Sequence, residues 1–145
     1  MRKLLIFCFS ICFLFTNCGK VQRSPLDGTS KLVFGNVVTP DTAFAYPVPA
    51  IGGDIKTIGR KYFTTIWQDT ASRKSDFWHA GFNGGTYTFE NGIYTENLMY
   101  FITPSGIGSK VAFKIEIKND TLVFNYIPAR GSDNIKSTEK YVRLE

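Results

Sequence analysis

The chain has little of what a metal site or a disulfide framework needs. Its 145 residues contain 1 His and 3 Cys, and two of the cysteines, Cys8 and Cys12, lie in an apolar N-terminal run. A structural zinc site takes about four Cys or His ligands, and a secreted disulfide scaffold keeps an even set of cysteines. We therefore expect no bound metal, no cofactor and no structural disulfide.

The excess of positive over negative charge is also small. The chain has 17 Lys+Arg against 12 Asp+Glu, and the basic residues are spread along it without forming a stripe. A nucleic-acid-binding protein usually gathers its Lys and Arg on one face. This distribution argues against a nucleic-acid partner.

The sequence also lacks the usual signs of an enzyme. It contains no nucleophile motif and no phosphate-binding loop. His79, the single His, has Asp76 nearby in sequence, but a lone His is more often a surface or packing residue. We predict no catalytic residue, and the enzyme question stays open only for one-carboxylate chemistry.

Aromatic and apolar residues, by contrast, are plentiful. Hydrophobic residues make up 43% of the chain and aromatic residues 15%, which argues against disorder. The length suits one small domain and not two.

The N-terminus has the pattern of a secretory signal. Met1, Arg2 and Lys3 give a positive start, and residues 4–15 are apolar except for Ser10. Such a run spans about 18 Å as a helix, well short of the ~30 Å hydrocarbon core of a bilayer. We therefore predict a cleaved signal peptide over residues 1–17 and no membrane-spanning helix there.

Phe15-Thr16-Asn17-Cys18 resembles the lipobox of bacterial lipoproteins, in a loose form similar to that of the Bacteroidota. The resemblance implies cleavage before Cys18 and acylation of its thiol. The alternative is an ordinary secreted protein with an unrelated cysteine near its cleavage site. After the lipobox, residues 18–25 look like a lipidated tether.

The lipobox resemblance implies that the protein is located in the bacterial cell envelope. Surface-exported lipoproteins of the Bacteroidota often carry acidic residues directly after the cysteine, whereas Lys20 and Arg23 are basic here. We expect a lipid anchor at the periplasmic face of the outer membrane.

Residues 26–145 read as one domain of short strands. No stretch keeps helical spacing for three turns, whereas alternation of apolar and polar residues is common. The expected strands cover residues 29–38, 54–58, 61–68, 76–82, 85–90, 93–102, 110–118, 121–127 and 138–144. Residues 39–53 and 128–137 should be loops, and turns are marked at 52–54, 83–84, 91–92, 106–108 and 119–120. We expect an all-β fold, an antiparallel meander barrel of eight or nine strands, with a sandwich as the alternative.

Two hairpins predict which side chains point inward. A two-residue turn at Asn91-Gly92 pairs Tyr87 with Glu96 and places both on the mostly apolar face. A turn at 119–120 does the same for a second hairpin, in which the pairs 117–122, 115–124 and 113–126 face inward. For residues 61–68 and 76–82, either face could be inside.

Several of these segments are similar to the lipocalin-like, calycin-type barrels of lipoproteins from the Bacteroidota, a family of mostly unknown function. Residues 26–33 resemble the opening strand, Gly84-Gly85-Thr86-Tyr87 the mid-chain Gly-Gly-x-Tyr, 94–96 the following Tyr-x-Glu, and 141–143 the closing aromatic-x-Arg. The resemblance covers roughly residues 26–144. It departs from the family at Ser30, where the opening strand usually carries Trp.

The inward faces supply candidate ligand-binding residues, together with the two tryptophans. They are Tyr87, Glu96, Tyr94, Phe89, Trp67, Trp78, Phe113 and Tyr126. A buried carboxylate must be paired, protonated or in contact with a ligand. Glu96 is therefore either the polar anchor of a ligand, helped by the Tyr87 hydroxyl, or part of a structural bond, for example to Arg143. The tryptophans could equally be core residues.

Three functions remain open. The first is an envelope-anchored, lipocalin-like barrel that binds a small apolar or amphipathic molecule. The alternatives are an envelope structural or protein-interaction lipoprotein with a filled barrel and, less favoured, a small enzyme using Glu96. The sequence leaves the oligomeric state open.

Replacing Cys18 tests the anchor. Two or three acyl chains, each contributing about 0.8 kcal/mol per buried CH₂, make membrane attachment effectively permanent. Cys18→Ala should therefore move the protein from the membrane pellet to the soluble fraction, and only the wild type should incorporate labelled palmitate. If the mutant stays in the membrane pellet and the wild type incorporates no labelled palmitate, the assignment of the anchor to Cys18 is wrong.

Overall fold

The computed structural model describes residues 23–46, 53–69, 79–130 and 134–144. The predicted signal peptide, Cys18, Asp76 and Trp78 lie outside these residues.

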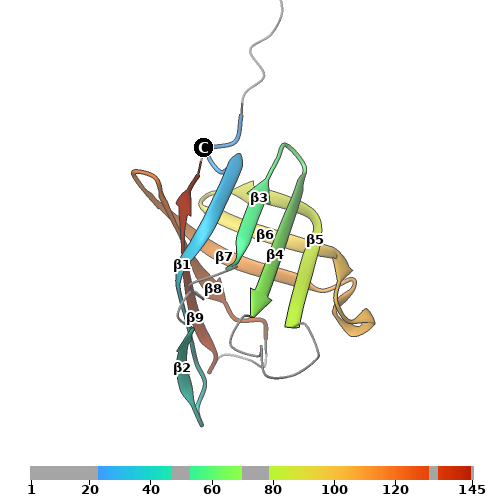
Figure 1. Cartoon of the computed structure of the whole chain (residues 1–145), viewed down its shortest axis with the longest axis vertical. Coiled ribbons are helices and arrows are strands. Elements are labelled where there is room, and N and C mark those ends of the chain that lie inside the picture. Colours follow the sequence, from blue (N-terminus) through green and yellow to red (C-terminus); the bar gives the residue numbers. More distant parts are fainter. Residues whose placement is uncertain (1–22, 47–52, 70–78, 131–133, 145) are drawn as a thin grey trace, which may run out of the picture.

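The described chain folds as one antiparallel sheet that closes on itself. Its strands are β1 (Gly28–Val38), β2 (Ala43–Tyr46), β3 (Ile55–Ile58), β4 (Tyr62–Asp69), β5 (His79–Glu90), β6 (Ile93–Phe101), β7 (Lys110–Lys118), β8 (Thr121–Ile127) and β9 (Lys136–Arg143), with a short 3-10 helix at Pro104–Gly106. Each strand from β3 to β9 pairs with the next, and β9 pairs with β1 (Figure 1). The result is an eight-stranded meander barrel, the architecture of lipocalins, and the expected fold class is confirmed.

The short strand β2 is an extension of this barrel. It pairs only with the second half of β1, whereas the first half of β1 pairs with β3. The turn between β1 and β2 is closed by Thr39, whose backbone NH and side-chain hydroxyl both donate to the Thr42 carbonyl. The prediction of a loop over residues 39–53 was therefore wrong for Ala43–Tyr46, which form β2. Pro40 lies in the turn before this strand, so it does not interrupt the pairing.

Both predicted hairpin registers are confirmed. Tyr87 pairs with Glu96 and Phe89 with Tyr94, around a turn in which Asn91 has φ 52° and Gly92 has φ 77°. The β7–β8 hairpin likewise pairs the residues expected from the 119–120 turn. In its turn, Asn119 has φ 53°, whereas Asp120 does not have a positive φ.

The predicted turn at Asn83-Gly84 does not exist. Residues 79–82 and 85–90, from the two expected strands 76–82 and 85–90, belong to the single strand β5, whose register with β6 shifts between Gly84 and Gly85. A Cβ atom on Gly85 would lie 1.9 Å from the Asn97 carbonyl oxygen. The glycines therefore serve a bulge with a close backbone approach, which a sequence pattern cannot distinguish from a turn. At the other end of the sheet, β9 begins at Lys136, inside the expected 128–137 loop.

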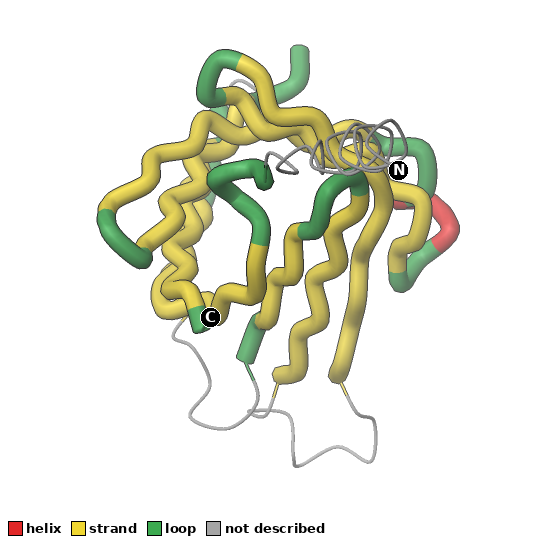
Figure 2. The backbone as a smooth tube through the Cα atoms, turned by 90° about the horizontal axis from the view of Figure 1, so that it is seen from above, coloured by secondary structure: helices red, strands yellow, loops and turns green. Residues whose placement is uncertain are grey.

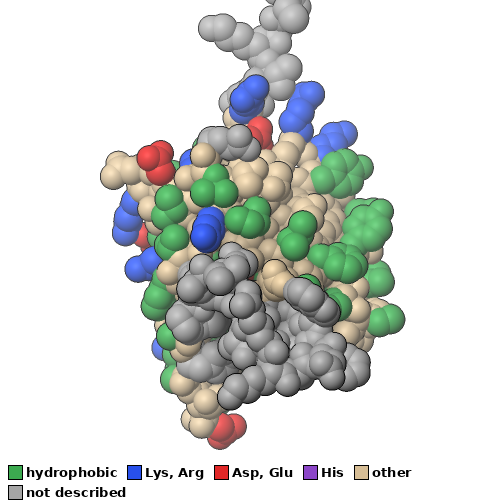
Figure 3. All heavy atoms as spheres, in the orientation of Figure 1, with side chains coloured by type: hydrophobic (Ala, Val, Ile, Leu, Met, Phe, Trp, Pro, Cys, Tyr) green, Lys and Arg blue, Asp and Glu red, His purple; other side chains and the backbone are tan. Residues whose placement is uncertain are grey.

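The faces left undecided by the sequence are now assigned. Phe63, Thr65 and Trp67 of β4 point inward, and Tyr62 and Ile66 are exposed on the outside. Figure 3 shows apolar side chains on this outer surface of the barrel.

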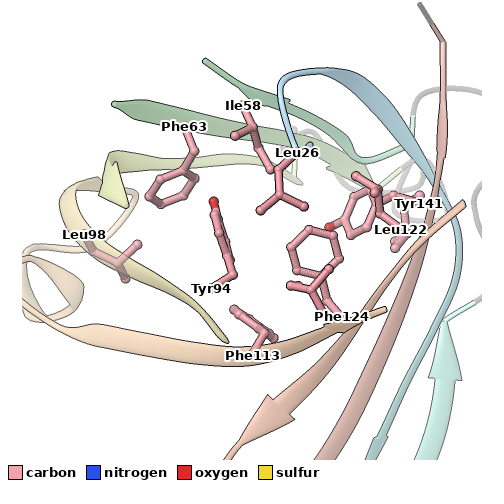
Figure 4. Close-up of a cluster of buried hydrophobic side chains, with 11 residues drawn as sticks. Leu26, Ile58, Phe63, Tyr94, Leu98, Phe113, Leu122, Phe124 and Tyr141 are labelled. Carbon is pink, nitrogen blue, oxygen red and sulfur yellow. The ribbon is translucent and has the colours of Figure 1, made fainter. Parts of the chain in front are cut away.

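The core lies inside the barrel, and eleven buried apolar side chains of the described residues belong to it (Figure 4). Figure 2 shows the strands curling round this interior. We call the end with the turns at 59–61, 91–92 and 119–120 the closed end, and the opposite end, with 39–42, 102–109 and 128–130, the loop end.

The closed end is sealed by the segment that enters the barrel. Leu26 is only 1% exposed and packs in the core. The Arg143 guanidinium donates to the carbonyls of Pro25 and Asp27, and the Tyr87 hydroxyl donates to the Gly59 carbonyl at 2.7 Å. These bonds tie both ends of the described chain to one rim of the barrel.

The bulge gives a prediction for stability. Gly85→Ala should lower the free energy of unfolding by about 1–3 kcal/mol, because the added methyl group meets backbone. Gly59→Ala is the matched control: its Cβ would meet nothing nearer than 3.7 Å, and a change below about 0.5 kcal/mol is expected. Urea denaturation of both variants measures the difference, and equal midpoints would contradict the tight contact at Gly85.

Candidate functional site

A buried ion pair lies at the centre of the barrel. Lys56 Nζ is 2.8 Å from Glu96 Oε1, and the two residues are 4% and 3% exposed. Lys56 comes from β3 and Glu96 from β6, two strands that are not neighbours in the sheet. The pair therefore crosses the interior and does not run along the wall.

Aromatic rings surround the lysine. Its Nζ lies 4.8–5.9 Å from the centroids of five rings, those of Phe63, Tyr94, Phe113, Phe124 and Tyr141. A cation at this distance is attracted by the ring faces. Ser30 is also buried and pairs with Lys56 across β1 and β3. The lipocalin-like barrels that the sequence resembles usually carry Trp at the position of Ser30. The smaller serine side chain leaves room for the lysine.

Two more carboxylates act on the pair. Burial, together with the nearby Glu139 charge, raises the pKa of Asp54 to about 7, against an opposing effect from Lys56. Burial by itself would lower the pKa of Lys56, but Glu96, Glu139 and Asp54 outweigh it and raise that pKa. The lysine is thus held as a cation, and the Asp54 carboxyl changes its ionisation near neutral pH.

Two tyrosines belong to the same cluster. The Tyr141 hydroxyl donates to Glu139 Oε2 at 3.1 Å, and burial and that carboxylate raise the pKa of Tyr141 well above its usual value. Burial and the Glu96 charge likewise raise the pKa of Tyr94. Both hydroxyls therefore remain protonated and can act only as neutral polar groups.

Some buried polar atoms have no hydrogen-bond partner among the described residues. They are Asp54 Oδ1, Thr65 Oγ1, Asn83 Oδ1 and the Tyr94 hydroxyl. Lys56 pairs with Thr65, and Thr65 pairs with Asn83, so these side chains share one row on the inner face. Leaving such atoms unsatisfied costs about 1–3 kcal/mol each, so the row is a candidate site for a polar group of a ligand.

The predicted site residues separate into distinct groups. Tyr94 and Phe113 are buried beside Lys56, and Phe89 and Tyr126 are half-buried against the same core. Trp67 is half-buried toward the loop end, with its indole over Gly81.

Two predicted partners of Glu96 were wrong. The Tyr87 ring lies beside that strand pair as expected, but its hydroxyl donates to Gly59, with Asp27 Oδ1 3.5 Å away. Arg143 bonds to Pro25 and Asp27 at the closed end. Both side chains close the barrel, and the partner of Glu96 is Lys56.

Sequence reasoning missed Lys56, Asp54 and Glu139 as members of the site. One signal was available: Asp54, Lys56 and Ile58 alternate, so an inward Ile58 carries the two charged residues with it. A lysine in a four-residue strand reads as a surface residue unless its pairing is known.

Within the part of the chain that the structure describes, no set of three or more His, Cys, Asp or Glu side chains is arranged to hold a metal ion. The same residues contain no helix long and apolar enough to cross a membrane.

Fold and site together define a lipocalin-like, closed antiparallel barrel with a charged interior. No family model matches the sequence, and no curated protein is significantly similar to it. A crystal structure of a lipocalin-like protein from Bacteroides uniformis aligns over 83% of this chain and 100% of that one, with 12% sequence identity and a TM-score of 0.48.

The ion pair predicts a strongly non-additive mutational cycle. Lys56→Met or Glu96→Leu alone should lower the free energy of unfolding by about 3–5 kcal/mol, because each leaves one buried charge without its partner. The double variant should recover most of that loss, since two apolar side chains replace both charges. Denaturant unfolding of the four proteins measures the coupling, and additive losses would mean that the pair is not coupled.

Proposed function

We propose that this protein is an envelope-anchored lipoprotein whose lipocalin-like barrel binds a small amphipathic molecule. The pattern around Cys18 supports the anchor, and the barrel interior supports the binding role.

The observation that carries the proposal is the ion pair inside an aromatic barrel. A barrel that only has to be filled needs apolar side chains, and replacing a buried ion pair by such side chains is often neutral or stabilising. Here Lys56 and Glu96 are enclosed, and the partly buried carboxyl groups of Asp54 and Glu139 act on Lys56. Charged groups retained at such a cost are better explained by recognition of a polar group than by packing.

The gradient of burial along the barrel gives the direction of entry. At the closed end Leu26, Ile58 and Phe63 are at most 3% exposed. Toward the loop end the inward side chains of Trp67 and Phe101 are only half-buried. An apolar ligand body would lie against these rings, with its polar end toward the charged cluster.

A filled, structural barrel is the second candidate, because eleven core side chains already pack together. An enzyme using Glu96 is less well supported. Lys56 is within hydrogen-bond reach of Glu96, but its raised pKa keeps it protonated, so it cannot act as a base near neutral pH.

Probe binding tests the proposal. The mature protein should enhance the fluorescence of N-phenyl-1-naphthylamine saturably. Val111→Trp should weaken this by at least about tenfold, a loss of 1.4 kcal/mol, because Val111 points inward beside Glu96 and an indole there occupies ligand space. Thr88→Trp, on the exposed outer face, is the matched control and should bind normally.

Circular dichroism establishes that both variants fold. A wild-type barrel that binds no probe, or equal binding by both tryptophan variants, would refute the interior site and leave the filled-barrel reading.

A further inference from the structure

Building on the proposed function, we infer that the polar end of the ligand is a cationic amine, bound by the Asp54 carboxylate together with the Thr65 hydroxyl and the Asn83 side-chain oxygen.

The first argument is the chemical type of the unpartnered atoms. Asn83 Oδ1 and the oxygens of an ionised Asp54 carboxylate only accept hydrogen bonds, and Thr65 Oγ1 can accept one. Thr65 is 4% exposed, so bulk water does not reach its hydroxyl. An ammonium group has three donors and no acceptor, and it therefore complements this set.

The second argument is position. Thr65 and Asn83 pair directly on neighbouring strands, which brings their side chains to about 5 Å from each other. Asp54 precedes Lys56 by two residues and so lies one step closer to the loop end on the same face. Asp54 thus lies between Lys56 and the proposed entry, and Thr65 and Asn83 lie level with Lys56 on the next two strands.

The third argument is charge. Among the described residues, the carboxylates of Asp54, Glu96 and Glu139 all act on Lys56. A fatty-acid carboxylate entering from the loop end would meet Asp54 first, whereas an amine would be attracted. Trp67 and Phe101, which pairs with Asn83, add aromatic surface that also favours a cation.

Ionisation of Asp54 makes the affinity depend on pH. The groups that face Asp54 are Lys56 on β3, Glu96 on β6, and Glu139 and Tyr141 on β9, whereas Ser30, Thr65, Trp67 and Asn83 on β1, β4 and β5 are uncharged. With its pKa about 7, this carboxyl is largely ionised at pH 8 and largely protonated at pH 6. An alkylamine stays protonated throughout, so its affinity should fall as the pH falls.

The experiment compares three ligands with the same chain in displacing N-phenyl-1-naphthylamine from the mature protein: dodecylamine, dodecanol and dodecanoate. Dodecylamine should bind at least tenfold more tightly than dodecanol at pH 8, and the preference should shrink several-fold at pH 6. Asp54→Asn should abolish the preference and its pH dependence, and Asp41→Asn, an exposed position in the β1–β2 turn, should keep both. Thr65→Val, which keeps the side-chain volume, should reduce amine affinity and leave dodecanol unchanged, which provides a second variant should Asp54→Asn not fold.

The outcomes separate the two proposals. Dodecanol or dodecanoate binding as tightly as dodecylamine, or an amine preference that survives in both Asp54→Asn and Thr65→Val, would overturn the amine assignment and leave a binding barrel. Binding of none of the three ligands and no probe would overturn the proposed function itself.

Discussion

The interior of this barrel depends on one contact, the ion pair between Lys56 and Glu96. A lysine enclosed by five aromatic rings has no access to bulk water, so its charge must be balanced from within the protein. Glu96 supplies that balance, and Asp54 and Glu139 add to it. The pair explains why the Lys56 side chain reaches across the barrel. It also gives a reason for the small side chain of Ser30, which pairs with Lys56 across β1 and β3.

Much of the fold could be predicted because its determinants are local. The Asn91-Gly92 turn fixes the register of the β5–β6 hairpin, and period-two alternation then assigns Glu96 and Tyr94 to the interior. The same reasoning failed at Asn83-Gly84, because its outcome depends on the backbone of Asn97 on the next strand. The sequence of a dipeptide does not reveal which backbone of another strand lies beside it.

The site was only half predictable for the same reason. Glu96 could be placed inside from its own hairpin, but its partner comes from a strand forty residues earlier in the chain. Tyr87 and Arg143 were reasonable partners by register and by resemblance, yet both bond to backbone carbonyls at the closed end. Which donor reaches a buried carboxylate is decided by the curvature of the closed sheet, a property of all eight strands together.

The sealing of the barrel by Leu26 also determines which end of the barrel the proposed anchor would join. An anchor at Cys18 is joined to Leu26 by eight peptide steps, a reach of no more than about 28 Å. A lipid anchor would therefore join the sealed rim of the barrel, at the end opposite the loop end. A ligand entering at the loop end, as proposed above, would therefore approach the barrel at the end opposite the anchor.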